Sequence, residues 1–346
     1  MWSHLLHKLQ RRWRQIAVTL LPLFFALLHI SDALHLQVLE RLDTIIYDSR
    51  LRVTMPRTLD ERIVIVDSDE ESLGRIGQWP WKRDKLATLT RELFERQKVA
   101  VVGFDVLFAE ADETSGLATL QQLAEGPLRD QPAFKEQLAR LAPSLNYDAL
   151  FAQSLRDHPV VLGYYLSGND RDGIKKGVLP PPAITRSQLR GLPLIATSWT
   201  GFSSNIESLA RAAPSAGFFN SVNDDDGVVR SLPLLAEYQG QYYESLALAM
   251  FRTVLGGPKV EPVFANATPD GSYDALQGIA LRQDGHTLVL PVDDQLATLI
   301  PYRGHGDAKG GSFTYISASD VLEGKLPAGQ LKDLLVLVGS TAPGLL

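Results

Sequence analysis

The residues best able to do chemistry in this sequence are carboxylates that accompany two apolar runs. The runs, IVIVDSD at residues 63–69 and AVVGFDVLFA at 100–109, are typical of buried strands. The acids at their ends are Asp67, Asp69, Glu110 and Asp112, and Asp105 lies within the second run. We expect the two strands to be parallel neighbours. Because the carboxyl ends of such strands meet at one edge of a sheet, the four end acids should face one cleft. That cleft suits a cation, an amine or a hydroxyl-rich ligand, although such acids also serve as helix caps and solvated turn residues.

Three side chains in the segment WPWKRD are expected near this edge. Arg83 would supply a counter-charge, while Trp79 and Trp81 either wall the site or belong to the core. A carboxylate cluster repels anions unless the side chains of Arg83 and Arg230 point into the site and neutralise it. Crowding among the carboxylates would also raise the pKa of at least one of them.

The segment Asp67-Ser68-Asp69 resembles the start of the nucleophile motif of haloacid dehalogenases. In that family the first Asp attacks a phosphate and the second acts as acid and base, so Asp67 would be a phosphohydrolase nucleophile. The sequence departs from the motif at Glu71, where Thr or Val is expected, and no distal acidic pair follows a third strand. An extracytoplasmic phosphohydrolase is therefore an alternative hypothesis.

The acidic segment Asn223–Gly227 invites a calcium-loop interpretation. If Gly227 were the sixth position of an EF-hand loop, Val222 and Pro233 would be its first and last ligands, and neither side chain can ligate. The segment is better explained as a turn between two strands, which could still place Asp226 and Arg230 beside a ligand. The seven histidines show no metal-binding spacing, so no metal site is assigned, and no cofactor is implied.

Charge is distributed unevenly along the 346 residues. Residues 1–15 contain four basic residues and no acid, which leaves 30 basic and 40 acidic residues in the remainder. An acidic body argues against nucleic-acid binding, which requires a basic face. The chain has no cysteine, which excludes disulfides, thiol catalysis and cysteine metal sites.

An apolar segment follows the basic start and predicts a transmembrane helix at residues 16–36. The uncharged stretch 16–30 is shorter than a full span, but the apolar pattern continues to Leu36, and Pro22 could kink the helix. A cleaved signal peptide and a buried soluble helix are the alternatives, although no small-x-small cleavage site follows promptly. The basic residues place 1–15 in the cytoplasm and everything after the span outside. The anchored chain would contact membrane lipid.

The remaining pattern predicts an α/β fold with a mixed sheet flanked by helices, preceded by the one membrane helix. A juxtamembrane helix is expected at 37–56, followed by one large domain at 57–346. Within it, a strand at 63–69, a helix at 82–97 and a strand at 100–109 form a βαβ pattern. Later elements include strands at 160–166 and 215–220, hairpin turns at Gln239-Gly240-Gln241 and Asp284-Gly285, and a helix at 245–255. A helix capped by Ser317 or Ser319 precedes a final buried strand.

Six segments occur in an order that resembles the type 2 CHASE domain, an extracellular sensory domain associated with cyclases and histidine kinases. They are IVIVDSDEESLGRIGQWPWKRD, AVVGFDVLFAEAD, GFFNSVNDDDGVVRSLPLL, SLALA, ISASDVLEG and LLVLVGSTAPGLL, which span the chain from about Ile46 to Leu346. The resemblance implies the sensory input domain of a bacterial receptor. In such receptors further membrane helices and a cytoplasmic output module follow, most commonly a class III adenylate or guanylate cyclase. The resemblance supplies neither catalytic nor ligand-binding residues.

We therefore expect the extracytoplasmic ligand-input region of a membrane receptor, not itself an enzyme, with the domain truncated at its C-terminal end. The expected partners are an unidentified small-molecule ligand and a second copy of the chain in a homodimer. The speculative ligand residues are Asp67, Asp69, Arg83, Glu110, Asp112, Asp226 and Arg230. The alternatives are the Asp67 phosphohydrolase and a purely structural dimerisation domain.

Overall fold

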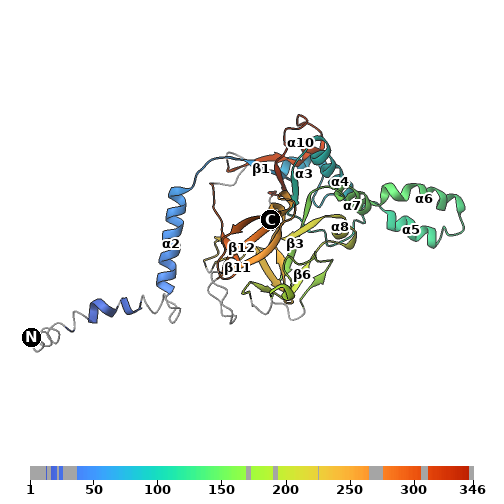
Figure 1. The fold of residues 1–346 in the computed structure, drawn as a ribbon. Coiled ribbons are helices and arrows are strands. Elements are labelled where there is room, and N and C mark those ends of the chain that lie inside the picture. Colours follow the sequence, from blue (N-terminus) through green and yellow to red (C-terminus); the bar gives the residue numbers. More distant parts are fainter. Residues whose placement is uncertain are drawn as a thin grey trace, which may run out of the picture. The chain divides into compact units, whose positions relative to one another are not determined.

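The computed structural model divides the chain into two compact units, Met1–Pro56 and Arg57–Leu346. It describes residues 13, 17–21, 23–25, 37–168, 173–189, 194–224, 226–264, 276–304 and 311–342 (Figure 1).

The described residues of the first unit are helical except for Met55 and Pro56 at its end. Residues 17–21 and 23–25 are helical, and α2 (Gln37–Thr54) ends just before Pro56, as the sequence predicts. Residues 16, 22 and 26–36 of the predicted membrane span lie outside the described residues. Within the described part of the chain, no helix combines the length and apolarity needed to cross a membrane.

The second unit is built on an eight-stranded sheet, and its α/β character confirms the predicted fold class. Six of its strands form a parallel series through β15 (Phe313–Ser317), β1 (Asp60–Asp67), β16 (Leu335–Gly339), β2 (Val101–Phe104), β3 (Val160–Ser167) and β7 (Ser215–Phe218). β6 (Gly201–Ser203) pairs antiparallel with β3, and β4 (Lys175–Lys176) pairs with β6. The prediction that β1 and β2 are neighbours is wrong, because β16, from the end of the chain, lies between them.

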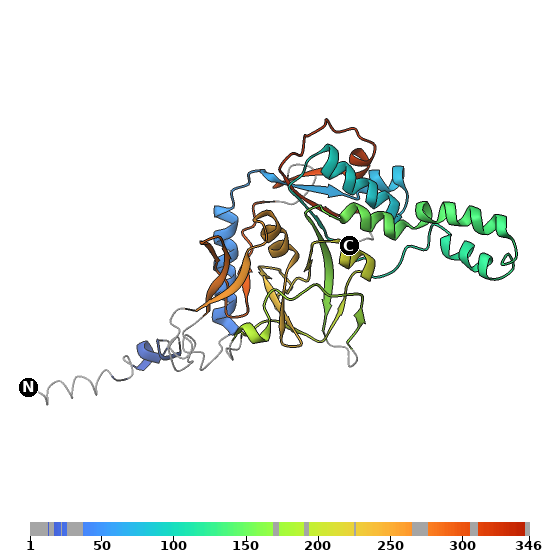
Figure 2. The same cartoon turned by 45° about the vertical axis from the view of Figure 1, so that its right-hand side comes forward.

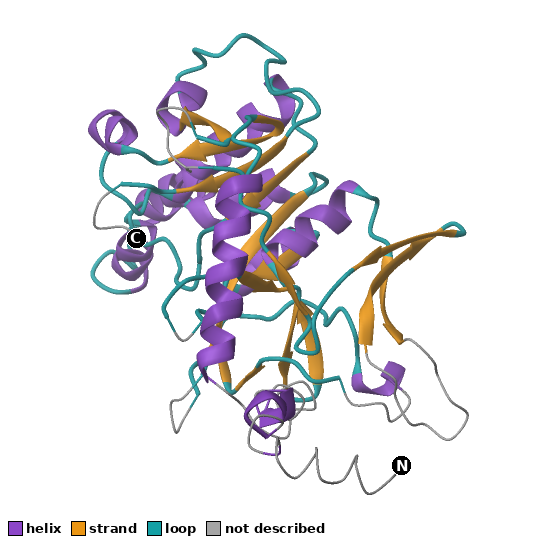
Figure 3. Cartoon of the chain, turned by 90° about the vertical axis from the view of Figure 1, so that its left-hand side faces the viewer, coloured by secondary structure: helices purple, strands orange, loops and turns teal. Residues whose placement is uncertain are grey.

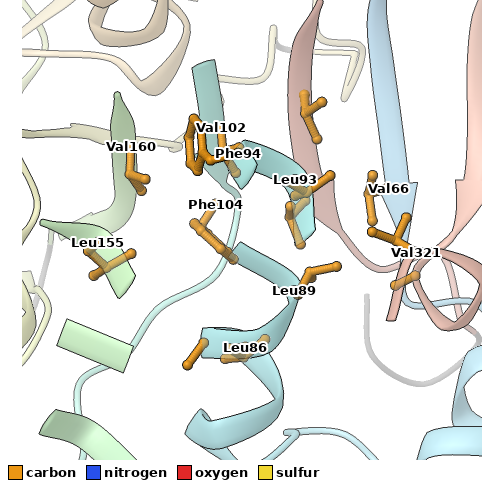
Figure 4. Close-up of a cluster of buried hydrophobic side chains, with 14 of the residues drawn as sticks. Val66, Leu86, Leu89, Leu93, Phe94, Val102, Phe104, Leu155, Val160 and Val321 are labelled. Carbon is orange, nitrogen blue, oxygen red and sulfur yellow. The ribbon is translucent and has the colours of Figure 1, made fainter. Parts of the chain in front are cut away.

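Helices cover one face of the sheet and enclose its largest core. They are α3 (Glu70–Ile76), α4 (Arg83–Arg91) with the π-helical turn η1 (Glu92–Arg96), α7 (Tyr147–Leu155), α8 (Glu207–Ala212) and α10 (Ala318–Leu322). Strand residues of alternating position, such as Val66, Val102 and Phe104, point towards Leu86 and Leu89 of α4 (Figure 4). Their complete burial fixes α4, and with it Arg83 at the start of that helix.

A single helix, α9 (Leu246–Val254), packs on the opposite face against β2, β3 and β7. Val101 and Val161 point towards it because they alternate with the residues of the first core. Its approach is close: a Cβ on Gly217 would lie 2.5 Å from the backbone of Leu246, and one on Gly103 would lie 2.2 Å from the sulfur of Met250. These glycines determine where α9 sits.

Two further helices form an appendage to the sheet. α5 (Leu117–Glu125) and α6 (Pro132–Leu145) contact each other and project away from the body (Figures 1 and 2). No side chain of α6 is buried, which agrees with the polar composition of this stretch.

Small sheets, antiparallel except for the parallel pair of β5 with β9, occupy much of the remaining chain (Figure 3). They comprise β5 (Ser198–Trp199), β9 (Leu235–Tyr238) and β10 (Gln241–Glu244); β11 (Lys259–Phe264), β12 (Leu276–Gln283) and β13 (His286–Leu290); and β8 (Ser231–Pro233) with β14 (Ala297–Leu299). A short 3₁₀ helix, η2, covers Arg186–Leu189. Both predicted hairpin turns are confirmed, with Gln239 and Gly240 at φ 52° and 74°, and Asp284 and Gly285 at φ 50° and 80°.

Candidate functional site

The carboxylate at the end of β1 is used to join two strands. Asp67 is only 3% exposed, and its Oδ1 accepts a hydrogen bond of 2.8 Å from the backbone N–H of Thr341. Its Oδ2 accepts from the hydroxyl of the same residue. The backbone N–H of Ser68 also donates to the carbonyl of Gly339 at 2.9 Å. Asp67 thus holds the segment after β16 against the end of β1.

Asp69 caps a helix and links it to a second one. Its Oδ1 accepts from the backbone N–H of Ser72 at 2.8 Å, which makes Asp69 the N-cap of α3, and from the hydroxyl of Ser317 at 2.9 Å. The hydroxyl of Ser72 in turn accepts from the backbone N–H of Ser319 at 3.0 Å. Hydroxyls therefore connect the N-termini of α3 and α10, and the predicted helix cap at 317 or 319 belongs to this junction.

Arg83 lies in a separate cluster at the end of β2. Its backbone N–H donates to Oδ2 of Asp112 at 2.7 Å, and its Nη2 donates to the carbonyl of Glu110 at 3.4 Å. Its Nε lies 3.7 Å from Oδ1 of Asp148, and its guanidinium carbon lies 4.4 Å from the ring centre of Phe108. The side chain is 11% exposed, so the predicted counter-charge is a buried one.

The environment shifts the charges of this cluster in different directions. Burial lowers the pKa of Arg83, against the opposing effect of Asp148 and Asp112. Burial raises the pKa of Asp148, although the N–H of Asp112 and the charge of Arg83 oppose it. Burial would also raise the pKa of Asp112, but hydrogen bonds from Arg83 and Thr114 outweigh it and lower that pKa. Asp112 is therefore not an acid whose pKa crowding raises, because fixed N–H donors stabilise its charged form.

The other predicted residues lie apart from this cluster. The exposed side chain of Glu110 pairs with Lys176 at 2.6 Å, and that hydrogen bond lowers its pKa. Arg230, with a side chain only 8% exposed, donates to carboxylates of Asp224 and Asp226 at 2.7 Å each. Hydrogen bonds from Arg230 and from the N–H of Val228 lower the pKa of Asp226 to about 2.

The structure therefore brings Arg83, Asp112 and the backbone of Glu110 together, while Asp67 and Asp69 lie across β16 and Asp226 with Arg230 forms its own turn. The role of these residues in ligand binding stays a prediction. Trp81 belongs to the core at 3% exposure, with Trp79 packed edge-on against it. Among the described residues, no three His, Asp or Glu side chains are grouped to hold a metal ion.

Open space occurs elsewhere, in a cavity of about 600 Å³ between the segment 178–183, the C-terminal ends of α8 and α9, and β7. Most of its wall is apolar and includes Leu162, Ala216 and the three consecutive prolines Pro180–Pro182. Its volume falls within the range of about 300–1,000 Å³ that is usual for small-molecule sites.

A partly buried ion pair forms the polar part of this wall. Both carboxylate oxygens of Glu244 accept from Nη1 of Arg252 at 2.6 Å, and Nε of Arg252 donates to the carbonyl of Pro258 at 2.9 Å. The two side chains are 12% and 21% exposed. Burial raises the pKa of Glu244 against the opposing effect of Arg252. Burial, and secondarily the charge of Glu244, also raises the pKa of Tyr164, whose hydroxyl is buried without a hydrogen-bond partner.

Sequence reasoning missed this pair. Glu244 ends a strand and Arg252 interrupts an apolar helix, and their contact depends on how α9 folds back from β10. The signals in the sequence were a lone arginine in SLALAMFRTVL and the run of three prolines, and neither was weighed as part of a site.

Comparison with protein families matched the CHASE2 domain model to residues 19–346. Comparison with curated proteins and with solved structures gave no match. The matched range includes the whole sheet and every residue that lines the cavity.

Proposed function

Because the chain belongs to the CHASE2 domain family, a family of extracellular sensory domains, we propose that it is the ligand-input region of a bacterial membrane receptor. The observation that carries this proposal is the family match over residues 19–346. The resemblance seen from six ordered segments of the sequence is confirmed by that match. A sensory role also agrees with a body that contains a partly polar cavity.

We propose that residues 16–36 anchor the chain in the lipid of the inner membrane, with the body on the periplasmic side. The support is the apolar sequence of this segment and the four basic residues before it. An alkaline phosphatase fused after Leu346 is expected to be active, and a fluorescent protein fused there to stay dark if its folding requires the cytoplasm. The reverse pair of results would contradict the placement.

The output of the receptor is proposed to be a class III adenylate or guanylate cyclase, as in other receptors that carry this kind of input domain. Reading the gene beyond the codon for Leu346 tests this directly. The expected result is a continuing frame with further membrane helices and a cyclase module. If the frame instead encodes a kinase or a diguanylate cyclase, the proposed cyclase output is wrong, but the proposed sensory role stands.

The phosphohydrolase alternative is opposed by the surroundings of Asp67. Both oxygens of its carboxylate accept hydrogen bonds from Thr341, so an attack on phosphate would require that segment to move. We expect the purified full chain with Mg²⁺ to leave generic phosphate esters intact. Turnover that is abolished in Asp67→Asn would contradict the proposal.

The receptor is proposed to work as a homodimer, which sedimentation of the purified full chain tests. A chain that dimerises tightly but that no small molecule stabilises would favour the purely structural alternative.

A further inference from the structure

The cavity contains hydrogen-bond donors that the protein itself does not use. Nη2 of Arg252 makes no hydrogen bond with any described residue and is not buried, whereas Nη1 and Nε of the same side chain are fully engaged. The hydroxyl of Ser215, which also lines the cavity, has no hydrogen-bond partner among the described residues. The unused capacity therefore includes two donors, and the charged N–H group at Nη2 makes its strongest hydrogen bonds with a carboxylate.

The charges around the cavity also favour an anion. Among the described residues of the wall, the one carboxylate is that of Glu244, and it already accepts two hydrogen bonds from Arg252. A second arginine, Arg211, lines the cavity with a side chain 78% exposed, and it pairs with Glu207 outside the lining. The C-terminal ends of α8 and α9 bring partial negative charge to this region, but Arg211 and Arg252 lie in those last turns and offset it.

The rest of the wall suits an apolar body. Three prolines have fixed backbone φ angles, so this part of the wall is formed before a ligand arrives. Leu162 is completely buried beneath the cavity and cannot move outward without disturbing the core of the sheet. A ligand that is apolar along most of its length and charged at one end would fit both parts of the lining.

Building on the proposed sensory function, we propose that this cavity is the input site and that its ligand is a small organic carboxylate with an apolar body. The carboxylate accepts hydrogen bonds from Nη2 of Arg252, with the Ser215 hydroxyl as the second free donor in the lining. The apolar body lies against Pro180–Pro182. Binding would act on α9 through Arg252, and α9 packs directly on β2, β3 and β7.

Three probes that share one body test the class of ligand. They are 4-phenylbutyrate, 4-phenylbutanamide and 4-phenylbutylamine, titrated calorimetrically into the purified full chain. A probe of this size is expected to bind with a Kd on the order of 1 mM. The carboxylate should bind about tenfold or more tightly than the amide and the amine, because only it brings a negative charge to Nη2 of Arg252. Equal binding of the three probes, or no binding of the carboxylate at ~10 mM, would overturn the proposal.

Two variants test the location. Arg252→Gln removes the free donor, and Ala210→Phe fills the cavity from α8 without touching the ion pair. Both are expected to weaken binding of the carboxylate at least about tenfold. Arg282→Gln, which removes an exposed arginine paired with Glu261 on another sheet, is the matched control and should leave binding unchanged.

If Arg252→Gln does not fold, Ala210→Phe decides the location alone. Binding that survives Ala210→Phe would place the ligand elsewhere. That failure is distinguishable from failure of the sensory proposal, because the reporter fusions and the downstream gene sequence test the receptor without reference to this cavity.

Discussion

Two arginines of this molecule, one buried and one partly buried, lie beside carboxylates in quite different settings. Arg83, 11% exposed, packs on the ring of Phe108 and lies between Asp112 and Asp148. Arg252, 21% exposed, binds Glu244 but also lines a cavity of about 600 Å³ and keeps one nitrogen free. The difference shows that clustered charge alone does not mark a binding site. Charge becomes available to a ligand where open space adjoins it.

The largest effect is expected from breaking the closed cluster. Arg83→Met leaves Asp112 and Asp148 buried without their cation, which typically costs about 3–5 kcal/mol of the free energy of unfolding. Arg252→Met should cost less, because the cavity admits water to Glu244 and the raised pKa of that carboxyl eases its protonation. Denaturant unfolding of the full chain measures both losses. A larger loss in Arg252→Met would reverse the comparison.

A control for the first variant lies on the same helix. Arg91→Met removes an exposed arginine from α4 and should change the free energy of unfolding by less than about 0.5 kcal/mol.

The next effect concerns the helix that carries Arg252. In Gly217→Ala the new Cβ meets the backbone of Leu246 at 2.5 Å, which should force α9 away from β7. We expect a loss of about 1–3 kcal/mol of the free energy of unfolding, together with weaker binding of 4-phenylbutyrate.

Gly103→Ala is the paired test, since its new Cβ meets only the flexible end of Met250. Its loss of stability should be the smaller of the two. Equal losses in the two variants would show that the position of α9 is not fixed by its contact with β7.

A smaller effect separates the two roles suggested for Asp69. Asp69→Ala removes the N-cap of α3 and should cost about 1 kcal/mol, whereas Asp69→Asn keeps a capping oxygen and should cost much less. Calorimetric titration with divalent cations and polyamines, on Asp69→Asn and Asp112→Asn, tests the predicted acidic site. Binding that is lost in both variants would show that this edge does hold a ligand.

The smallest effect is the titration of an exposed carboxylate that is paired with a buried arginine. Asp226 has a pKa lowered to about 2 by Arg230 and Val228, below the ordinary 3.8. A depressed carboxyl pKa adds stability that is fully present above pH 3.8 and is lost as the pH falls towards 2. Carboxyl-carbon NMR of Asp226 should show this midpoint, and Arg230→Gln should move it upward. If the midpoint of Asp226 is the same in Arg230→Gln, Arg230 is not the cause of the lowered pKa.

Local sequence patterns predicted many of the elements but few of their long-range partners. The runs that became β1, β2 and β3, the two hairpin turns and the helix α9 follow from periodicity and turn residues, which are local properties. The insertion of β16 between β1 and β2 depends on a strand from the far end of the chain, and no local pattern contains that pairing. The consequence was that Asp67 and Asp112 were expected side by side.

The contacts within the two charged clusters were also only partly predictable from local sequence. The grouping of Arg83 with Asp112 could be predicted because both residues lie next to recognisable elements. Arg83 is at the start of α4, and Asp112 is in the segment that follows β2. Their buried partner Asp148 comes from α7, and Glu244 meets Arg252 only through the turn from β10 into α9. Contacts of this kind arise from tertiary packing, so residue type and spacing could not reveal them.

Hydrogen exchange of the full chain with and without saturating 4-phenylbutyrate tests the central claim most directly. The cavity is predicted to be the input site, so exchange should slow in the segments 205–216 and 246–257, each of which contributes residues to its lining. Slower exchange at residues 83–86 and 110–114, with no change around the cavity, would contradict the account and return the input site to the acidic edge of the sheet.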